Sequence, residues 1–280
     1  MSRFSLIGIG TGFNDQAAGT PPSSKSLQKG RRSKGRRGKG SSGVAASNMS
    51  PQYVESDQGA TVGAGDMTFT IPAGVPDGAA LVAVIQWGGQ TTDTVRTFTN
   101  AGWSTALSST DDSTSGLYHG VTVMTKAASG ETGGGTWTFT KNVSCPAIGK
   151  VYVLPSFSTT LDVSSTVQAR NFLTGNDANL LTLARTPAVD NSFIIHLVSR
   201  NFAGSGSLPG TSFSDFGATV AAKIDEKTLF NNNAAYYVNG VVGSYTQTTA
   251  TITTAQAYVM TGSAGINWKM CWGVIIVPPA

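Results

Sequence analysis

The sequence predicts an all-β protein: an antiparallel β-sandwich, jelly-roll-like, with an extended basic N-terminal arm. Three observations predict this fold. Apolar residues follow a two-residue period or form short runs, as in strands. Turn residues separate these segments at spacings of roughly 8–12 residues, as in sandwiches and barrels. No stretch shows a convincing 3.6-residue period, and about a dozen strands can be counted, which suits one double sheet.

Charge divides the chain into an arm, residues 1–50, and a single β-sandwich domain, residues 51–280. The arm carries nine Lys or Arg against one acidic residue, a net charge of +8, and the remainder carries ten against fourteen, a net of −4. A segment with few apolar residues cannot offset its ordering entropy alone. We therefore expect the arm to dock onto a negative partner through Lys25, Lys29, Arg31, Arg32, Lys34, Arg36, Arg37 and Lys39.

Alternating segments predict strands with one apolar face. Residues 66–71 place Met67, Phe69 and Ile71 on one side. Residues 136–140 alternate threonines with Trp137 and Phe139. The last predicted strand, residues 268–277, gathers a set of large apolar residues on one face: Trp268, Met270, Trp272, Val274 and Ile276.

Three runs are apolar on both faces and predict central strands covered from both sides: residues 81–85, 148–154 and 193–198. The Asn239-Gly240 dipeptide predicts a tight hairpin turn, because both turn positions need positive φ. Residues 220–230 form the best candidate for a helix, although the segment is short and ambiguous. We find no internal repeat of fixed period.

Few residues carry reactive chemistry. His196 lies in an apolar strand and is expected to be a hydrogen-bonded core or half-buried histidine, whereas His119 lies in a Ser/Gly/Tyr turn region and is expected to be exposed. Cys145 and Cys271 are expected to be two buried free thiols, with a disulfide as the alternative.

Motifs for catalysis and cofactors are missing from the sequence. The glycines at residues 8–12 lack the spacing and following helix of a dinucleotide loop. Residues 204–207 do not form a Gly-x-Ser-x-Gly nucleophile elbow. No run approaches the roughly 20 apolar residues of a membrane span. We expect a protein that is not an enzyme, with no metal, no cofactor and no membrane partner.

Four aromatic residues in Gly/Ser-rich stretches are candidates for exposed contact residues: Tyr118, Phe202, Phe213 and Phe216. The alternative is that these stretches fold over the ends of the sandwich.

The basic arm is compatible with three roles. It could neutralise nucleic-acid phosphates, dock onto an acidic protein surface, or solubilise the chain. Residues 25–39 contain no aromatic residues between the cations, which base-stacking proteins use. We therefore rank protein docking first and nucleic-acid binding second.

Several stretches, taken in order, carry a resemblance to a known family. They are FTIPAGVPDGAALVAVIQWGG (69–89), AGWSTA (101–106), VMTKAASGETGGGTWTFT (123–140), VDNSFIIHLVS (189–199) and GINWKMCWGVIIVPPA (265–280). Over residues 60–280 the body resembles the β-sandwich domain of tailed-bacteriophage virion structural proteins, such as tail fibres, head fibres and decoration proteins. The arm lies outside this resemblance.

The resemblance implies a non-enzymatic virion component that is made in the host cytoplasm. Residues 1–50 would contact capsid or tail subunits, and the sandwich would be displayed on the surface, with host attachment as one role. A homo-oligomer is expected, with a trimer favoured. Two alternatives stay open: a jelly-roll capsid protein whose arm binds packaged nucleic acid, and a carbohydrate-binding adhesin.

Overall fold

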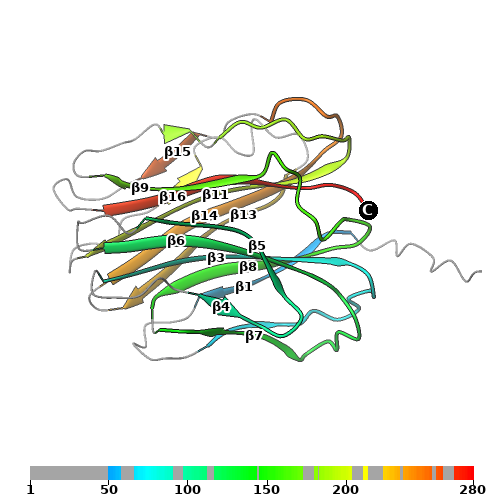
Figure 1. Cartoon of the computed structure of the whole chain (residues 1–280), viewed down its shortest axis with the longest axis horizontal. Helices are drawn as coiled ribbons and strands as arrows, with labels where there is room; N and C mark the ends of the chain where they lie inside the picture. Colours follow the sequence, from blue (N-terminus) through cyan, green and yellow to red (C-terminus); the bar gives the residue numbers. More distant parts are fainter. Residues whose placement is uncertain are drawn as a thin grey trace, which may run out of the picture. The chain divides into compact units, whose positions relative to one another are not determined.

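The computed structural model contains sixteen strands in four antiparallel sheets in its described part (Figure 1). The description covers residues 50–57, 66–90, 97–111, 117–143, 145–172, 180–181, 183–203, 211–213, 223–233, 236–253, 257–260 and 268–280. These residues belong to one compact unit. The predicted all-β, sandwich-like fold is confirmed, and the predicted arm lies outside the described residues.

The first half of the fold has eight strands: β1 (Gln52–Asp57), β2 (Met67–Thr70), β3 (Ala80–Gln90), β4 (Phe98–Thr99), β5 (Ser104–Asp111), β6 (Leu117–Ala127), β7 (Thr136–Lys141) and β8 (Ala147–Leu154). They form a five-stranded sheet of order β1-β8-β3-β6-β5 and a three-stranded sheet of order β2-β7-β4.

The second half has eight more strands: β9 (Thr166–Phe172), β10 (Leu180–Leu181), β11 (Ser192–Ala203), β12 (Thr211–Phe213), β13 (Lys223–Asn233), β14 (Tyr236–Gln247), β15 (Ala257–Met260) and β16 (Trp268–Val277). They form a five-stranded sheet of order β9-β16-β11-β14-β13 and a three-stranded sheet of order β10-β15-β12.

The two halves have the same topology. Adding eight to each strand number in a sheet of the first half gives the strand order of the corresponding sheet in the second half. In each half the first strand pairs with the eighth, the second with the seventh and the third with the sixth. This pairing is that of a long hairpin rolled into a jelly roll. Equivalent strands start 112 residues apart for β3 and β11 but 121 apart for β8 and β16, so the sequence has no fixed period.

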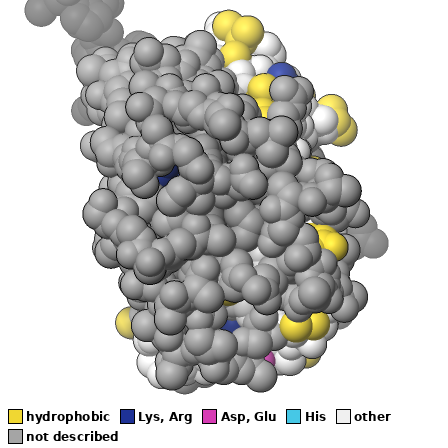
Figure 2. All heavy atoms as spheres, turned by 90° about the vertical axis from the view of Figure 1, so that its left-hand side faces the viewer, with side chains coloured by type: hydrophobic (Ala, Val, Ile, Leu, Met, Phe, Trp, Pro, Cys, Tyr) yellow, Lys and Arg dark blue, Asp and Glu magenta, His cyan; other side chains and the backbone are white. Residues whose placement is uncertain are grey.

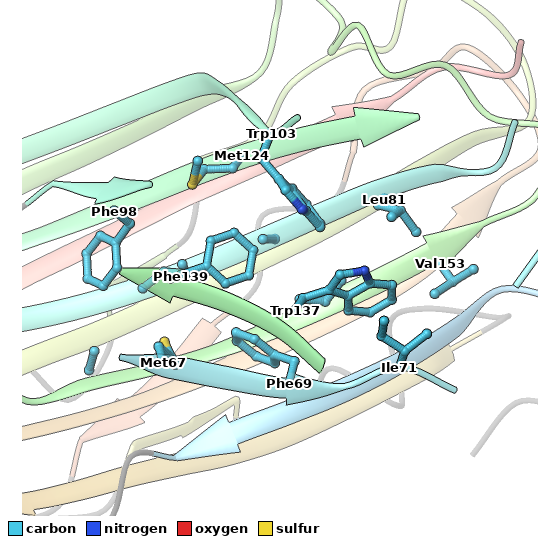
Figure 3. Packing of buried hydrophobic residues seen from close by; sticks show 14 of the residues in the cluster. Met67, Phe69, Ile71, Leu81, Phe98, Trp103, Met124, Trp137, Phe139 and Val153 are labelled. Carbon is cyan, nitrogen blue, oxygen red and sulfur yellow. The ribbon is translucent and has the colours of Figure 1, made fainter. Parts of the chain in front are cut away.

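The sheets stack in layers with a separate apolar cluster between successive layers. The first cluster joins the sheet β2-β7-β4 to one face of the first five-stranded sheet, with edge-to-face contacts such as Phe139 of β7 to Trp103, directly before β5, at 5.0 Å (Figure 3). The second cluster lies between the two five-stranded sheets and includes Val82, Val84, Ile195 and Leu197. The third covers the other face of the second five-stranded sheet.

Contacts between the two five-stranded sheets are arranged around an approximate two-fold axis. The equivalent strands β3 and β11 contact each other at the centre. On either side the contacts come in equivalent pairs: β3 with β14 and β11 with β6, then β6 with β16 and β14 with β8. The two halves therefore pack through equivalent faces, as the subunits of an isologous dimer do.

Several sequence predictions are confirmed at the level of single strands. Met67 and Phe69 are buried and alternate with exposed threonines in β2, and Trp137 and Phe139 are buried in β7 between threonines that are exposed or half-buried. Residues 81–85, 148–154 and 193–198 are buried on both faces, as expected of central strands.

One predicted turn is wrong. Asn239-Gly240 is not a hairpin turn, because residues 236–247 form one continuous strand, β14. Gly240 is needed for close packing instead: a Cβ there would lie 2.9 Å from Ser199 Cβ and 3.0 Å from Ile148 Cδ1. The ambiguous helix candidate lies largely within a strand, β13, which pairs with β14 along its length.

Candidate functional site

The predicted anchoring residues of the arm, Lys25 to Lys39, lie outside the described residues. The structure does show where the first strand of the body, β1, lies. Gln52 is the register partner of Val153, near the end of β8. At the same end of the layers, the Ala280 amide donates to the Ser156 carbonyl at 2.9 Å. The first and last described residues of the body thus lie close to the start of the linker between the halves, residues 155–165 (Figure 1).

The predicted aromatic contact residues are dispersed. Tyr118 is half-buried in β6 and packs against the first cluster. Phe202 and Phe213 belong to strands β11 and β12, and their side chains are not described; Phe216 lies outside the described residues. The described part of the structure does not bring these aromatic side chains together into one surface.

A polar contact joins the two five-stranded sheets near one end of the second cluster. His119 Nε2 on β6 and Ser199 Oγ on β11 share a hydrogen bond of 2.8 Å, and both residues are fully buried. The prediction that His119 is exposed is therefore wrong. Its turn-like neighbours in sequence lie within β6, and the second half of the fold covers it.

Two more buried polar residues lie in the same layer. Lys150 is fully buried, and its Nζ donates to the Val242 carbonyl at 3.4 Å and lies 5.0 Å from the ring centre of Tyr53. A Cβ added at Gly240 would collide with the side-chain amide oxygen of Gln86, so one of the two would have to shift. Polar contacts between the halves fix their relative position more narrowly than apolar packing alone does.

A serine within hydrogen-bond reach of a histidine is the geometry of a nucleophile and its base. Asp111 on the neighbouring strand β5 is the register partner of His119. Substrate cannot reach this Ser199 hydroxyl in the structure, because Ser199 and His119 have no exposed surface. The arrangement serves to join the two sheets.

The outer face of the second five-stranded sheet holds a second buried polar group. His196 stacks on Tyr245 with ring centres 5.9 Å apart, and burial lowers the pKa of His196 to about 3. Burial also lowers the pKa of Arg200 to about 10 and raises the pKa of Tyr245 to about 12. His196 is therefore neutral at physiological pH, as expected for a core histidine.

The linker between the halves is held by one buried carboxylate, Asp162. Its Oδ1 accepts from the Ser164 amide at 2.7 Å and the Ser164 hydroxyl at 2.6 Å, and its Oδ2 accepts from the Ala188 amide at 2.7 Å. Burial raises the pKa of Asp162, but the hydrogen bonds from Ser164 and Ala188 outweigh it, so the pKa lies below its ordinary value.

The two cysteines are buried and free, which confirms the first of the two expectations. Among the described residues, no group of three or more His, Cys, Asp or Glu is placed to hold a metal ion. The part of the chain that the structure describes contains no helix long and apolar enough to span a membrane.

Comparisons with known proteins gave no match: no family description, no curated protein and no solved structure corresponds to this chain.

One surface feature escaped the sequence reasoning. A hollow of about 320 Å³ lies between β5 and the linker, and the exposed Val163 is one of its lining residues. The sequence around Val163 does not indicate a hollow, because the hollow forms only where two segments that are distant in the chain, β5 and the linker, meet.

Proposed function

We propose that this protein is a structural component of a bacteriophage particle, a fibre or decoration protein that is anchored by its basic arm and displays the β-sandwich body. The observation that carries the proposal is the division of the chain into an arm of net charge +8 and a body of net charge −4. The resemblance of residues 60–280 to virion β-sandwich domains supports the same assignment.

The end of the body at which β1 begins suits an anchored base. Its turns are tied together by backbone hydrogen bonds: the Gly78 amide donates to the Ala128 carbonyl at 2.8 Å, and the Ser158 amide donates to the Pro278 carbonyl at 2.9 Å. A load applied through the arm at β1 would pass directly into the β1–β8 pair and the linker.

The opposite end is compatible with display. Figure 2 shows that end, where only a few described side chains reach the surface and the described lysine and arginine atoms appear at separate points. In the sequence, positive charge is concentrated in residues 1–50, which supports docking through the arm.

A jelly-roll capsid protein whose arm binds packaged nucleic acid is the second candidate. The jelly-roll pairing of both halves favours it, because jelly rolls are frequent in capsid shells. The eight cations of the arm would neutralise phosphates and make binding steeply dependent on salt.

Particle incorporation tests the first proposal. Three versions of the chain are supplied in trans during particle assembly: the full chain, residues 51–280, and a full-length variant in which the eight cations of residues 25–39 are replaced by glutamine. The truncated and neutralised chains should fold, as judged by circular dichroism, yet be absent from purified particles. Incorporation of both at the level of the full chain refutes arm anchoring.

Nucleic-acid binding separates the two candidates. Fluorescence anisotropy with a short DNA duplex is measured for the full chain and the glutamine variant at about 50 and about 200 mM salt. Tight binding that weakens by orders of magnitude over this range, and that the glutamine variant lacks, supports the capsid candidate. Absence of binding at the lower salt removes it.

A further inference from the structure

The chain passes from the first half of the fold to the second through a tight turn at residues 154–157. The Phe157 amide donates to the Leu154 carbonyl at 3.4 Å, and Ser156 has a φ of 64°. Pro155 fixes a negative φ at the position before Ser156. A turn with these two features is of type II, whose third residue is normally glycine. Ser156 thus holds a conformation that is strained for a residue with a side chain.

Beyond this turn the linker is bound to the second half of the fold. Three hydrogen bonds hold it there: the Ser158 amide donates to the Pro278 carbonyl at 2.9 Å, the Asp162 amide donates to the Ile276 carbonyl at 2.9 Å, and the Ile276 amide donates to Ser165 Oγ at 2.8 Å. The linker therefore moves with the second half if the two halves separate. The turn at residues 154–157 is the hinge between them.

The interface between the two halves consists of contacts between residues before the hinge and residues after it. The facing sides of the two five-stranded sheets share one apolar cluster. Two polar contacts cross the same interface: His119 Nε2 to Ser199 Oγ at 2.8 Å, and Lys150 Nζ to the Val242 carbonyl at 3.4 Å. All of these contacts form again between chains when the first half of one copy meets the second half of another.

We propose that this chain forms a domain-swapped dimer, in which the turn at residues 154–157 is extended and the first half of each copy packs on the second half of the other. The contact surface is complementary and fully buried, because it is the interface that already exists inside one chain. Extending the turn also relieves the strained φ of Ser156 in both copies. The proposal does not depend on the phage assignment, and it gives a dimer where the resemblance favoured a trimer.

Two substitutions at Ser156 should change the association in opposite directions. Ser156→Gly removes the strain of the closed turn and should lower the dimer association constant on the order of tenfold. Ser156→Val makes a positive φ more costly and favours an extended backbone, so it should raise the constant by a similar factor. Ser156 is exposed, so neither change disturbs the core. The full chain and both variants are refolded from urea at about 1 and about 100 µM, and light scattering after gel filtration measures their mass.

Asn191→Val is the matched control. Asn191 is the other non-glycine residue with positive φ among the described residues, at 60°, and it is also exposed. Its turn lies within the second half, so it is the same in the closed monomer and in the swapped dimer. Asn191→Val should therefore lower the stability and leave the dimer association constant unchanged. An equal rise in dimer for Asn191→Val and Ser156→Val would mean that association follows from general destabilisation, which contradicts the proposal.

Cutting the linker distinguishes a swapped dimer from two closed chains in contact. The recognition sequence of a site-specific protease is inserted between Thr159 and the exposed Thr160, and the uncut protein is the control. In a swapped dimer the linkers are the covalent connections between two lobes, so cleavage should give particles of monomer mass. A dimer of closed chains keeps its mass after cleavage. A full chain that stays monomeric after refolding at about 100 µM, or a dimer whose mass survives cleavage, overturns the proposal.

Discussion

Asp77 and Asp190 occupy the same structural position in the two halves of the fold. Each precedes the third strand of its half, and each accepts a backbone hydrogen bond from the loop between the sixth and seventh strands: Asp77 Oδ1 from Gly130 at 2.8 Å, and Asp190 Oδ1 from Ala250 at 2.6 Å. The residue after each has positive φ, 82° at Gly78 and 60° at Asn191. The repetition thus extends from strand order to single hydrogen bonds.

This turn gives a first prediction. Gly78→Ala should destabilise the protein by about 1–2 kcal/mol, because an L-residue is strained at this φ. The surroundings add nothing to the cost, since a Cβ at Gly78 meets no atom within 4 Å. Asn191→Gly should be neutral or slightly stabilising for the same backbone reason. Urea unfolding measures the stability of both variants, and equal stabilities of Gly78→Ala and Asn191→Gly would contradict the prediction.

The close approach at Gly240 gives a second prediction. Gly240→Ala should destabilise by about 1–3 kcal/mol through overpacking between the halves. Its added Cβ collides first with the amide oxygen of Gln86 and then with Ser199. Adding Gln86→Ala should recover part of the loss. The check is a double-mutant cycle by thermal or urea unfolding, and strict additivity of the two substitutions would argue against a direct collision.

A third prediction concerns pH. The pKa of His196 is about 3 in the folded protein and about 6.5 when unfolded, so the folded state binds fewer protons. Its contribution to stability is complete above pH 6.5 and is lost as the pH falls toward 3, with a slope of up to about 1.4 kcal/mol per pH unit.

Between pH 7 and pH 5 the free energy of unfolding should fall by about 2 kcal/mol through His196 alone. His196→Phe keeps an aromatic ring against Tyr245 and removes the titration, so its unfolding free energy should fall less over this range. Urea titrations at the two pH values test this. An unchanged pH dependence in the variant would show that His196 is protonated without unfolding.

The linker carboxylate gives a fourth prediction. Asp162→Asn replaces an acceptor of three hydrogen bonds by an amide with one acceptor oxygen, and should destabilise by about 1–3 kcal/mol. Because the folded pKa of Asp162 is lowered, the wild-type advantage is present above the unfolded pKa and disappears as the pH falls through the folded value. Calorimetry at neutral and acidic pH measures both effects, and an advantage that persists in acid would contradict the assignment.

Strand positions could be predicted from the sequence because they depend on local alternation, as Met67 and Phe69 or Trp137 and Phe139 illustrate. The role of Gly240 in close packing could not be predicted from the sequence. Glycine is selected both for positive φ in turns and for close approach of two sheets, and the local sequence is the same in both cases. The decisive neighbour, Gln86, is distant in the chain.

Neither the burial of His119 nor the repeated topology could be predicted from local sequence patterns. His119 is buried by Ser199 from the other half, and no local pattern around His119 carries that information. The two halves repeat the order in which strands pair, and they repeat turns such as Asp77-Gly78 and Asp190-Asn191. Their loops differ in length, so the number of residues between equivalent strands is not constant. A search for a constant period therefore fails even though the topology recurs.

The apolar layer shared by the two five-stranded sheets has a consequence for synthesis of the chain. Strand β8 leaves the ribosome while β16, more than a hundred residues downstream, is still untranslated. At typical elongation rates this interval lasts on the order of ten seconds. During that time the nascent first half holds Val82, Val84 and Tyr152 without their partners. Translation speed and chaperone supply should therefore limit the yield of soluble protein more than its final stability does.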